Sequence, residues 1–209
     1  MPLGRYTVLG ADGTPVGVEE FRCAPGPMGW RYFSEITTDE PEPHAEIVDL
    51  TVDAAWRPVR LRVAAGEHEI VLEPDGDRVR GHRDGEPLDL AWSDGHHVDY
   101  LTPSANLVTC RRLQETADID VLYVSPATLE PAVTRQRYEL LGPDTIDTAM
   151  GRFESTRWRF TFLDETGWTS ELWVAGDVVV AYEDLYVLEW YEPGATGARP
   201  EPAERSRND

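Results

Sequence analysis

The chain contains no lysine, and all 19 of its basic residues are arginines. Schiff-base catalysis and phosphate binding by a P-loop both require a lysine side chain, so both chemistries are excluded. Cysteine is almost as scarce, because only Cys23 and Cys110 are present and they are far apart in the sequence. This spacing fits neither a zinc motif nor a redox motif, and it favours free thiols in a reducing compartment.

Positive charge is also in short supply, since the formal net charge is −20. Binding to nucleic acid needs basic side chains to neutralise phosphates, and an anionic membrane surface would repel such a chain. No segment approaches the roughly 18 continuous apolar residues of a membrane-spanning helix, and Met1–Gly10 lacks the pattern of a signal peptide. We therefore expect a cytoplasmic protein with no nucleic-acid partner and no membrane insertion. The sequence does not indicate an oligomeric state.

What the chain does have is a series of Asp-Gly pairs, at 75-76, 84-85 and 94-95, between segments that alternate apolar and polar residues. This is the strongest short-range signal for a β-hairpin, because a type I′ turn needs positive φ at both central residues. Similar alternation elsewhere predicts strands over most of the chain up to Tyr191. Thr102-Pro103 is typical of a helix start, with Thr102 as N-cap and Pro103 at the first helical position.

These patterns predict a mainly β protein with a single antiparallel meander sheet and one or two short helices. Residues 1–191 are expected to form one domain, which is long enough to bury a full core. Residues 192–209 contain no large apolar side chain, and they predict a disordered, acidic tail rich in proline and glycine.

Tight turns also predict which residues lie opposite one another. With turn centres at 65-66, 75-76, 84-85 and 94-95, one face of the meander is almost entirely apolar. On the other face, this register places arginines opposite acidic residues, as expected for cross-strand pairs. The predicted apolar face consists of Leu61, Ile70, Leu72, Val79, Leu88, Leu90, Trp92 and Leu101. The candidate ligand-binding residues on this face are Leu61, Ile70, Leu72, Leu88, Leu90 and Trp92.

Two polar residues, His97 and Asp99, interrupt this apolar face. They are two apart on one predicted strand, so their side chains should point the same way. A carboxylate beside an imidazole fixes its tautomer and raises its basicity, which is what a general acid/base requires. The alternative is a structural pair, or a pair at the solvated margin of the sheet. A metal site needs three converging ligands and only two converge here, so we expect no metal, and no cofactor signature is present.

The chain is rich in tryptophan, with seven in 209 residues. Aromatic side chains pack well in sheet cores, and this is one interpretation. The other is a pocket with aromatic and aliphatic walls and few polar groups, which suits a lipid-like or polycyclic ligand. In a strongly curved sheet the concave face can be core and cavity at once.

Two later segments carry recognisable motifs. The first runs from Asp99 through Thr102-Pro103 and Asn106 to Arg111-Arg112-Leu113, and the second contains Leu129-Glu130 and Gln136-Arg137-Tyr138. Both resemble motifs of the putative glycolipid-binding domain family of bacteria. Thr109-Cys110 stands where that family carries a proline before the Arg-Arg pair.

The resemblance implies a strongly curved, half-open β barrel, similar to bacterial lipoprotein-carrier proteins, whose concave face suits an acyl chain. It also implies that Asp99, Asn106, Arg111 and Arg112 lie at the mouth of the cavity. Arginine suits a carboxylate or phosphate head group because its donors form a bidentate fork.

Three functions follow as hypotheses. The first is a soluble binding or carrier protein that holds a hydrophobic or amphipathic, lipid-like small molecule on the concave face. The second is a cofactor-independent enzyme, a cyclase, isomerase or hydrolase, with His97 and Asp99 as catalytic acid/base pair. The third is a structural or protein-binding domain whose interior is filled by its own side chains.

Overall fold

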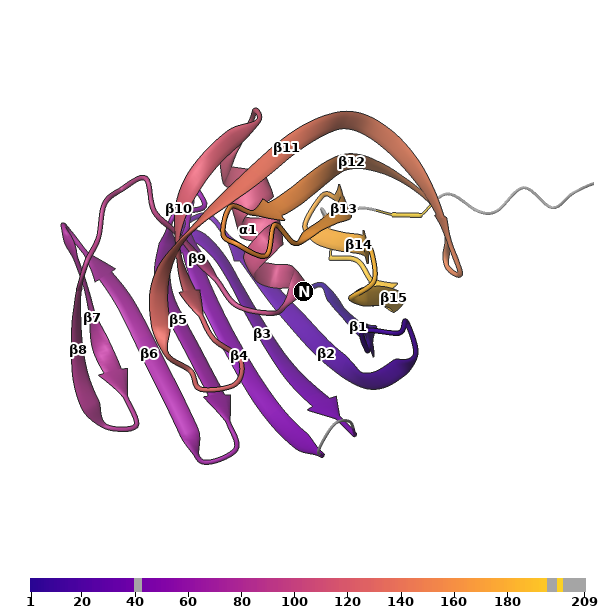
Figure 1. The fold of residues 1–209 in the computed structure, drawn as a ribbon. Coiled ribbons are helices and arrows are strands. Elements are labelled where there is room, and N and C mark those ends of the chain that lie inside the picture. Colours follow the sequence, from indigo (N-terminus) through magenta and orange to yellow (C-terminus); the bar gives the residue numbers. More distant parts are fainter. Residues whose placement is uncertain (40–42, 195–198, 201–209) are drawn as a thin grey trace, which may run out of the picture.

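The computed structural model describes residues 1–39, 43–194 and 199–200, and Figure 1 shows their arrangement. Its strands are β1 (Leu3–Leu9), β2 (Pro15–Gly26), β3 (Gly29–Thr38), β4 (His44–Asp53), β5 (Pro58–Ala65), β6 (His68–Asp75), β7 (Arg78–Arg83), β8 (Glu86–Ala91), β9 (His97–Asp99), β10 (Ala117–Val124), β11 (Pro131–Thr148), β12 (Gly151–Phe162), β13 (Thr169–Ala175), β14 (Val178–Tyr182) and β15 (Tyr186–Glu192). Among the described residues there is one helix, α1 (Pro103–Arg112).

All the strands belong to one open sheet, in the order β8 to β1 followed by β15 to β9. Thus β1–β8 form one meander and β10–β15 form a second, and the two are joined where β1 pairs with β15. The meanders confirm that the protein is mainly β. The two edges of the described sheet are β8 and β9.

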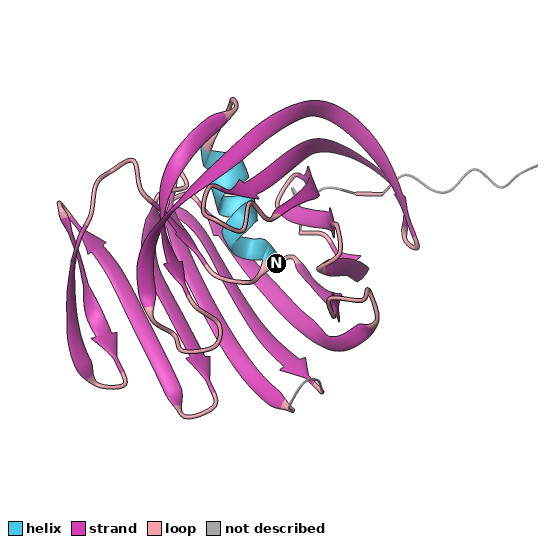
Figure 2. Ribbon diagram, viewed as in Figure 1, coloured by secondary structure: helices cyan, strands magenta, loops and turns pink. Residues whose placement is uncertain are grey.

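Helix α1 occupies the interior, and β11 and β12 arch over it (Figure 2). Thr102 is its N-cap and Pro103 opens its first turn, which confirms the predicted helix start. Its first eight residues, Pro103–Cys110, are all buried. A helix buried on every side is part of the core, so α1 fills space that an open half-barrel would leave empty.

The sheet is not purely antiparallel, because β9 pairs with β10 in parallel, with His97 opposite Val121. The predicted hairpin between β8 and β9 is therefore wrong. Neither Asp94 nor Gly95 has the positive φ that a type I′ turn requires. After β8 ends, the chain turns at Ser93–His96 and continues into β9. Two strands joined through a helix pair in parallel, and β9–α1–β10 is such a unit.

The predicted register of two other hairpins is wrong by two residues. Leu61 lies opposite Leu72, not Ile70, and Leu72 lies opposite Gly81. The turn centres are Gly66-Glu67 and Gly76-Asp77, because glycine takes positive φ at the first central position. At Asp84-Gly85 both residues have positive φ, and here the predicted pairing of Gly81 with Leu88 is confirmed.

A shift of two residues leaves every side chain on its predicted face, because the period of a strand is two. Leu61, Ile70 and Leu72 are accordingly buried in the core.

The predicted tail, 192–209, begins at the last residue of β15. Most of its remaining residues lie outside the described part of the chain. Over the whole described part of the chain, no helix has the length and apolar character needed to span a membrane.

Arg112 holds the β8–β9 connection in place. Its guanidinium donates hydrogen bonds to the carbonyl oxygens of His96, at 2.7 Å, and of Asp94. The guanidinium of the neighbouring Arg111 donates no hydrogen bond to a backbone carbonyl of the described residues, although both arginines lie in the last turn of α1.

We therefore expect Arg112→Met to lower the free energy of unfolding by about 1–3 kcal/mol, since two charged hydrogen bonds are lost, a half-buried one to His96 and an exposed one to Asp94. Arg111→Met removes the same charge from the same helix end and should cost less than about 1 kcal/mol. Urea unfolding monitored by circular dichroism measures both. Equal losses in the two variants would contradict this role of Arg112.

Candidate functional site

The C-terminal end of α1 lies beside a cavity of about 440 Å³. We call it the arch cavity, because its other wall comes from the strands that arch over the helix. Leu140, Trp158 and Val174 supply apolar surface, and Arg111 is the charged residue of its lining. The complete lining is Cys110, Arg111, Leu113, Gln114, Leu140, Thr156, Trp158, Val174 and Gly176.

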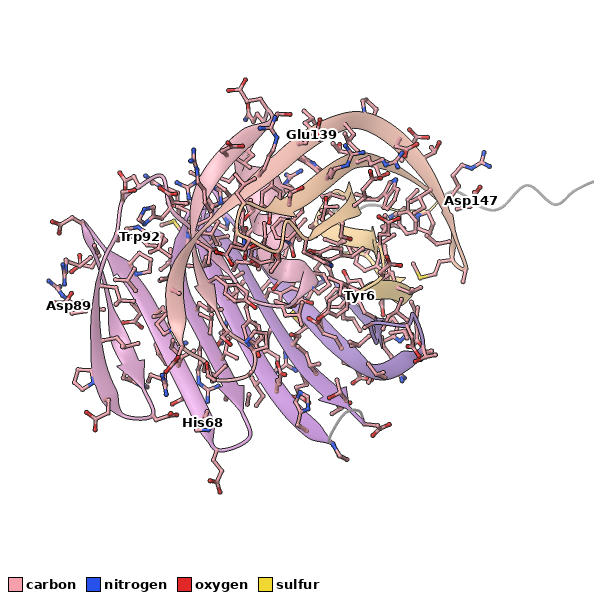
Figure 3. The ribbon with its side chains drawn as sticks, in the orientation of Figure 1. Tyr6, His68, Asp89, Trp92, Glu139 and Asp147 are labelled. Carbon is pink, nitrogen blue, oxygen red and sulfur yellow. The ribbon has the colours of Figure 1, made fainter. Side chains whose placement is uncertain are left out.

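A second, smaller cavity of about 140 Å³ lies near Arg112. We call it the hairpin cavity, since it is lined by turns of the N-terminal meander. Trp92, which lies between the β8 edge and the β9–β10 end of the sheet in Figure 3, also contributes to it. Its remaining lining residues are Asp53, Arg57, Pro58, Pro74, Gly76 and Asp94. Three of the predicted ligand-binding residues, Trp92, Arg111 and Arg112, thus line cavities.

Arg111 stacks on an aromatic side chain. Its guanidinium carbon lies 5.1 Å from the ring centroid of Trp56, and Trp56 in turn contacts Trp30, with centroids 5.5 Å apart. No carboxylate of the described residues forms an ion pair with Arg111. The arginine is therefore an exposed cation held on an aromatic face.

The other two motif residues, Asp99 and Asn106, do not lie at a mouth but inside the protein, with 7% and 3% of their surface exposed. Asn106 donates a hydrogen bond to the Tyr138 hydroxyl at 2.8 Å, and Gln136 Nε2 donates to Asp99 Oδ2 at 2.7 Å. The two sequence motifs therefore bond to each other across the core. Asp99 and Asn106 are buried because they lie on β9 and α1, which are inside the protein. Buried polar side chains need internal hydrogen-bond partners, and Gln136 and Tyr138 provide them.

His97 and Asp99 are both buried but make no hydrogen bond to each other. His97 Nδ1 lies 3.2 Å from the Thr109 hydroxyl of α1, while Asp99 is bonded to Gln136 of β11. The predicted pair is therefore absent, because each side chain has a partner on a different neighbouring element. Burial, with smaller contributions from Arg112 and His96, lowers the pKa of His97 to about 3, so the imidazole is neutral at ordinary pH.

Sequence reasoning missed a second buried acid, Glu19. It accepts hydrogen bonds from Tyr32 at 2.6 Å and from Thr102, the N-cap of α1, at 2.7 Å. Burial raises the pKa of Glu19 to about 7, although these hydroxyls act in the opposite direction. The signal was present, because Glu19 alternates with Phe21 and Cys23 on the buried face of β2.

The apolar residues predicted to bind a ligand on the N-terminal meander are placed differently from one another. Leu61, Ile70 and Leu72 are at most 2% exposed, so a ligand could reach them only if the side chains above them moved. Leu88 and Leu90 are half-buried because they lie on the edge strand β8. Their role in binding stays a prediction. Among the described residues, no group of three His, Cys, Asp or Glu side chains is arranged to hold a metal ion.

The buried Asp99 should make stability depend on pH. Burial raises its pKa from the ordinary 3.8 to about 6, so between these values the folded state binds a proton that the unfolded state releases. Stability conferred by this proton is present below about pH 4 and is lost as pH rises through about 6.

We expect Asp99→Asn to reduce the loss of stability between pH 5 and pH 8 by about 1–2 kcal/mol. Asparagine keeps an oxygen for Gln136 but does not titrate. Chemical unfolding at both pH values measures the difference, with Glu154→Gln on the exposed side of β12 as the control. An unchanged slope in Asp99→Asn would show that this carboxyl does not titrate in that range.

Comparisons with known proteins agree with this architecture. A crystal structure of a DUF1089 family protein from Pseudomonas aeruginosa superimposes with a TM-score of 0.57 at 19% identity, covering 81% of this chain and 91% of that one. A beta-barrel-like protein of the DUF1849 domain of unknown function from Brucella abortus gives 0.55 at 8% identity, covering 91% and 95%. These likenesses show the fold. No curated protein matches the chain significantly. The family model described as "Putative glycolipid-binding" matches residues 11–185, and the chain therefore belongs to this family.

Proposed function

We propose that the protein binds a hydrophobic or amphipathic, lipid-like small molecule, and that the arch cavity holds it. One observation carries this proposal: Leu140, Trp158 and Val174 share the lining of the cavity with a single charged residue, Arg111. Its volume of about 440 Å³ falls within the range of small-molecule sites, which are concave and equipped with a few polar groups. The surface of the cavity is more polar than apolar, which suits an amphipathic ligand better than a purely apolar one. Membership of a family described as glycolipid-binding supports the same function.

The lining of the cavity fits an amphipathic molecule, which either a binding protein or a carrier would hold. Arg111 is exposed and Leu113 and Leu140 are half-buried, while Trp158 and Val174, at 3% and 7% exposure, are almost completely covered by neighbouring side chains. An apolar tail would lie against Leu113 and Leu140, and the polar end of the ligand would face Arg111. We include in this proposal the strongly curved, half-open barrel predicted from the sequence. In it, α1 would form the inner wall of the ligand site.

Binding is favoured over catalysis by the geometry of the two candidate catalytic residues. A general acid/base pair needs its imidazole and carboxylate in contact, and here Thr109 and Gln136 are the partners instead. The low pKa of His97 also makes its imidazole a weak base. Neither residue is among those that line the arch cavity.

Filling the cavity should abolish binding. Thr156 lies in the lining, opposite Val174 on the neighbouring strand, and Thr156→Trp would place an indole in the space of the ligand. We expect the affinity for dodecyl phosphate or dodecyl maltoside, titrated calorimetrically below their micelle concentrations, to fall by about tenfold or more. The matched control is Thr145→Trp, on the exposed surface of β11.

If Thr156→Trp and Thr145→Trp bind both detergents as the native protein does, the ligand site lies elsewhere. Native mass spectrometry of protein purified from its own host adds a test without an assumed ligand. We expect a retained amphiphile on the native protein and none on Thr156→Trp.

A further inference from the structure

The arch cavity differs in charge from the rest of this acidic protein. Arg111 is the only charged residue among those that line it. By contrast, the hairpin cavity has Asp53 and Asp94 beside Arg57 and Arg112, and a groove of about 340 Å³ at β2 and β3 has Glu20 and Glu35 beside Arg22. A groove of about 230 Å³ also lacks carboxylates, but Arg31, one of its two arginines, is paired with Asp49. In a chain of net charge −20, a cavity lined by an arginine and no carboxylate favours an anionic ligand.

Arg111 also differs from the arginines near it. On the strands of the arch, Arg157 and Arg159 both form ion pairs with Glu171. Arg112, its neighbour in sequence, directs its donors to backbone carbonyls. Arg111 has neither kind of partner in the described part of the chain, so its N–H groups can bind a ligand.

Trp56 determines where this guanidinium lies. The guanidinium carbon lies over the indole ring, 5.1 Å from its centroid, and no acceptor of the described residues takes a hydrogen bond from the guanidinium N–H groups, which are the groups that bind an oxyanion in bidentate fashion. Trp56 has a φ of +62°, in the left-handed region, which is unfavourable for a bulky side chain. The turn is kept in place by Asp53, which accepts hydrogen bonds from the backbone N–H groups of Ala55 and Arg57 at 2.8 and 2.9 Å.

From these contacts we infer that the arch cavity selects amphiphiles with an anionic head group, a carboxylate, phosphate or sulfate. Arg111 binds the anion and Trp56 is the residue that positions Arg111. The inference rests on the proposed function, because it specifies the polar end of a ligand whose apolar end lies in the same cavity.

The test compares three probes that share a dodecyl chain: dodecyl phosphate, dodecyl maltoside and dodecyltrimethylammonium, titrated calorimetrically below their micelle concentrations. We expect dodecyl phosphate to bind at least roughly tenfold more tightly than the other two, because a guanidinium forms charged, bidentate hydrogen bonds with a phosphate. Arg111→Gln should remove this preference, so that the affinities for dodecyl phosphate and dodecyl maltoside become similar. Arg137→Gln, at a surface arginine paired with Asp118, is the control and should retain the preference.

Trp56 is tested by the ratio of the affinities for the phosphate and the maltoside probes. Asparagine tolerates positive φ, so Trp56→Asn should fold but lose stacking, and its ratio should fall toward one. Trp56→Phe keeps an aromatic face and should restore most of the ratio. A purely structural role of Trp56 would weaken both probes equally and leave the ratio unchanged, which would overturn its positioning role.

Each remaining outcome separates the inference from the proposed function. If no probe binds, the proposed function fails. If the probes bind equally, or the cationic probe binds best, the anion selectivity is wrong and the binding function stands. If dodecyl phosphate binds best but Arg111→Gln has no effect, Arg111 does not bind the anion and the inference is overturned. If inorganic phosphate competes as effectively as dodecyl phosphate, the site takes a free anion and the inference of an amphiphile is overturned.

Discussion

Burial of the first eight residues of α1, Pro103–Cys110, is the constraint on which the rest of the structure depends. Water cannot satisfy the polar groups of the helix or of the segment that leads into it, so each needs a partner inside the protein. Thr102 donates to Glu19, Asn106 donates to Tyr138, and Thr109 contacts His97. These partners come from β2, β11 and β9, and they fix the helix against both meanders at once. The polar residues that look functional in the sequence are, for the most part, the means by which the helix is held.

The helix also explains why the candidate site residues separate into two groups. Those near its N-terminal end, Asp99 and Asn106, are bonded inside the core. Those at its C-terminal end, Arg111 and Arg112, line cavities. Buried groups at one end keep the helix in a single position, and this fixed position makes a cavity possible at the other end. A ligand at the C-terminal end would therefore meet a preformed site whose shape is set by hydrogen bonds far from it.

Sequence reasoning predicted the features that depend on local chemistry. The turn at Asp84-Gly85, the start of α1 at Pro103 and the buried face of Leu61 and Leu72 all follow from short patterns. It failed where distant segments decide. The parallel pairing of β9 depends on a helix that returns the chain to β10, and the partners of His97 and Asp99 come from α1 and β11. The role of Trp56 was hidden because its left-handed backbone breaks the alternation that strands would show.

The pairing of β1 with β15 has a consequence for folding during synthesis. These strands are separated by nearly the entire described chain, yet Leu3 pairs with Glu192 and the Tyr6 hydroxyl donates to the carbonyl oxygen of Val179. On the ribosome, the N-terminal meander emerges first, and the outer side of β1 stays without its hydrogen-bonding neighbour until β15 has been synthesised. Such a contact, distant in sequence, forms late in folding, and an unpaired strand is a template for association with other chains. The nascent protein is therefore most exposed to aggregation along β1.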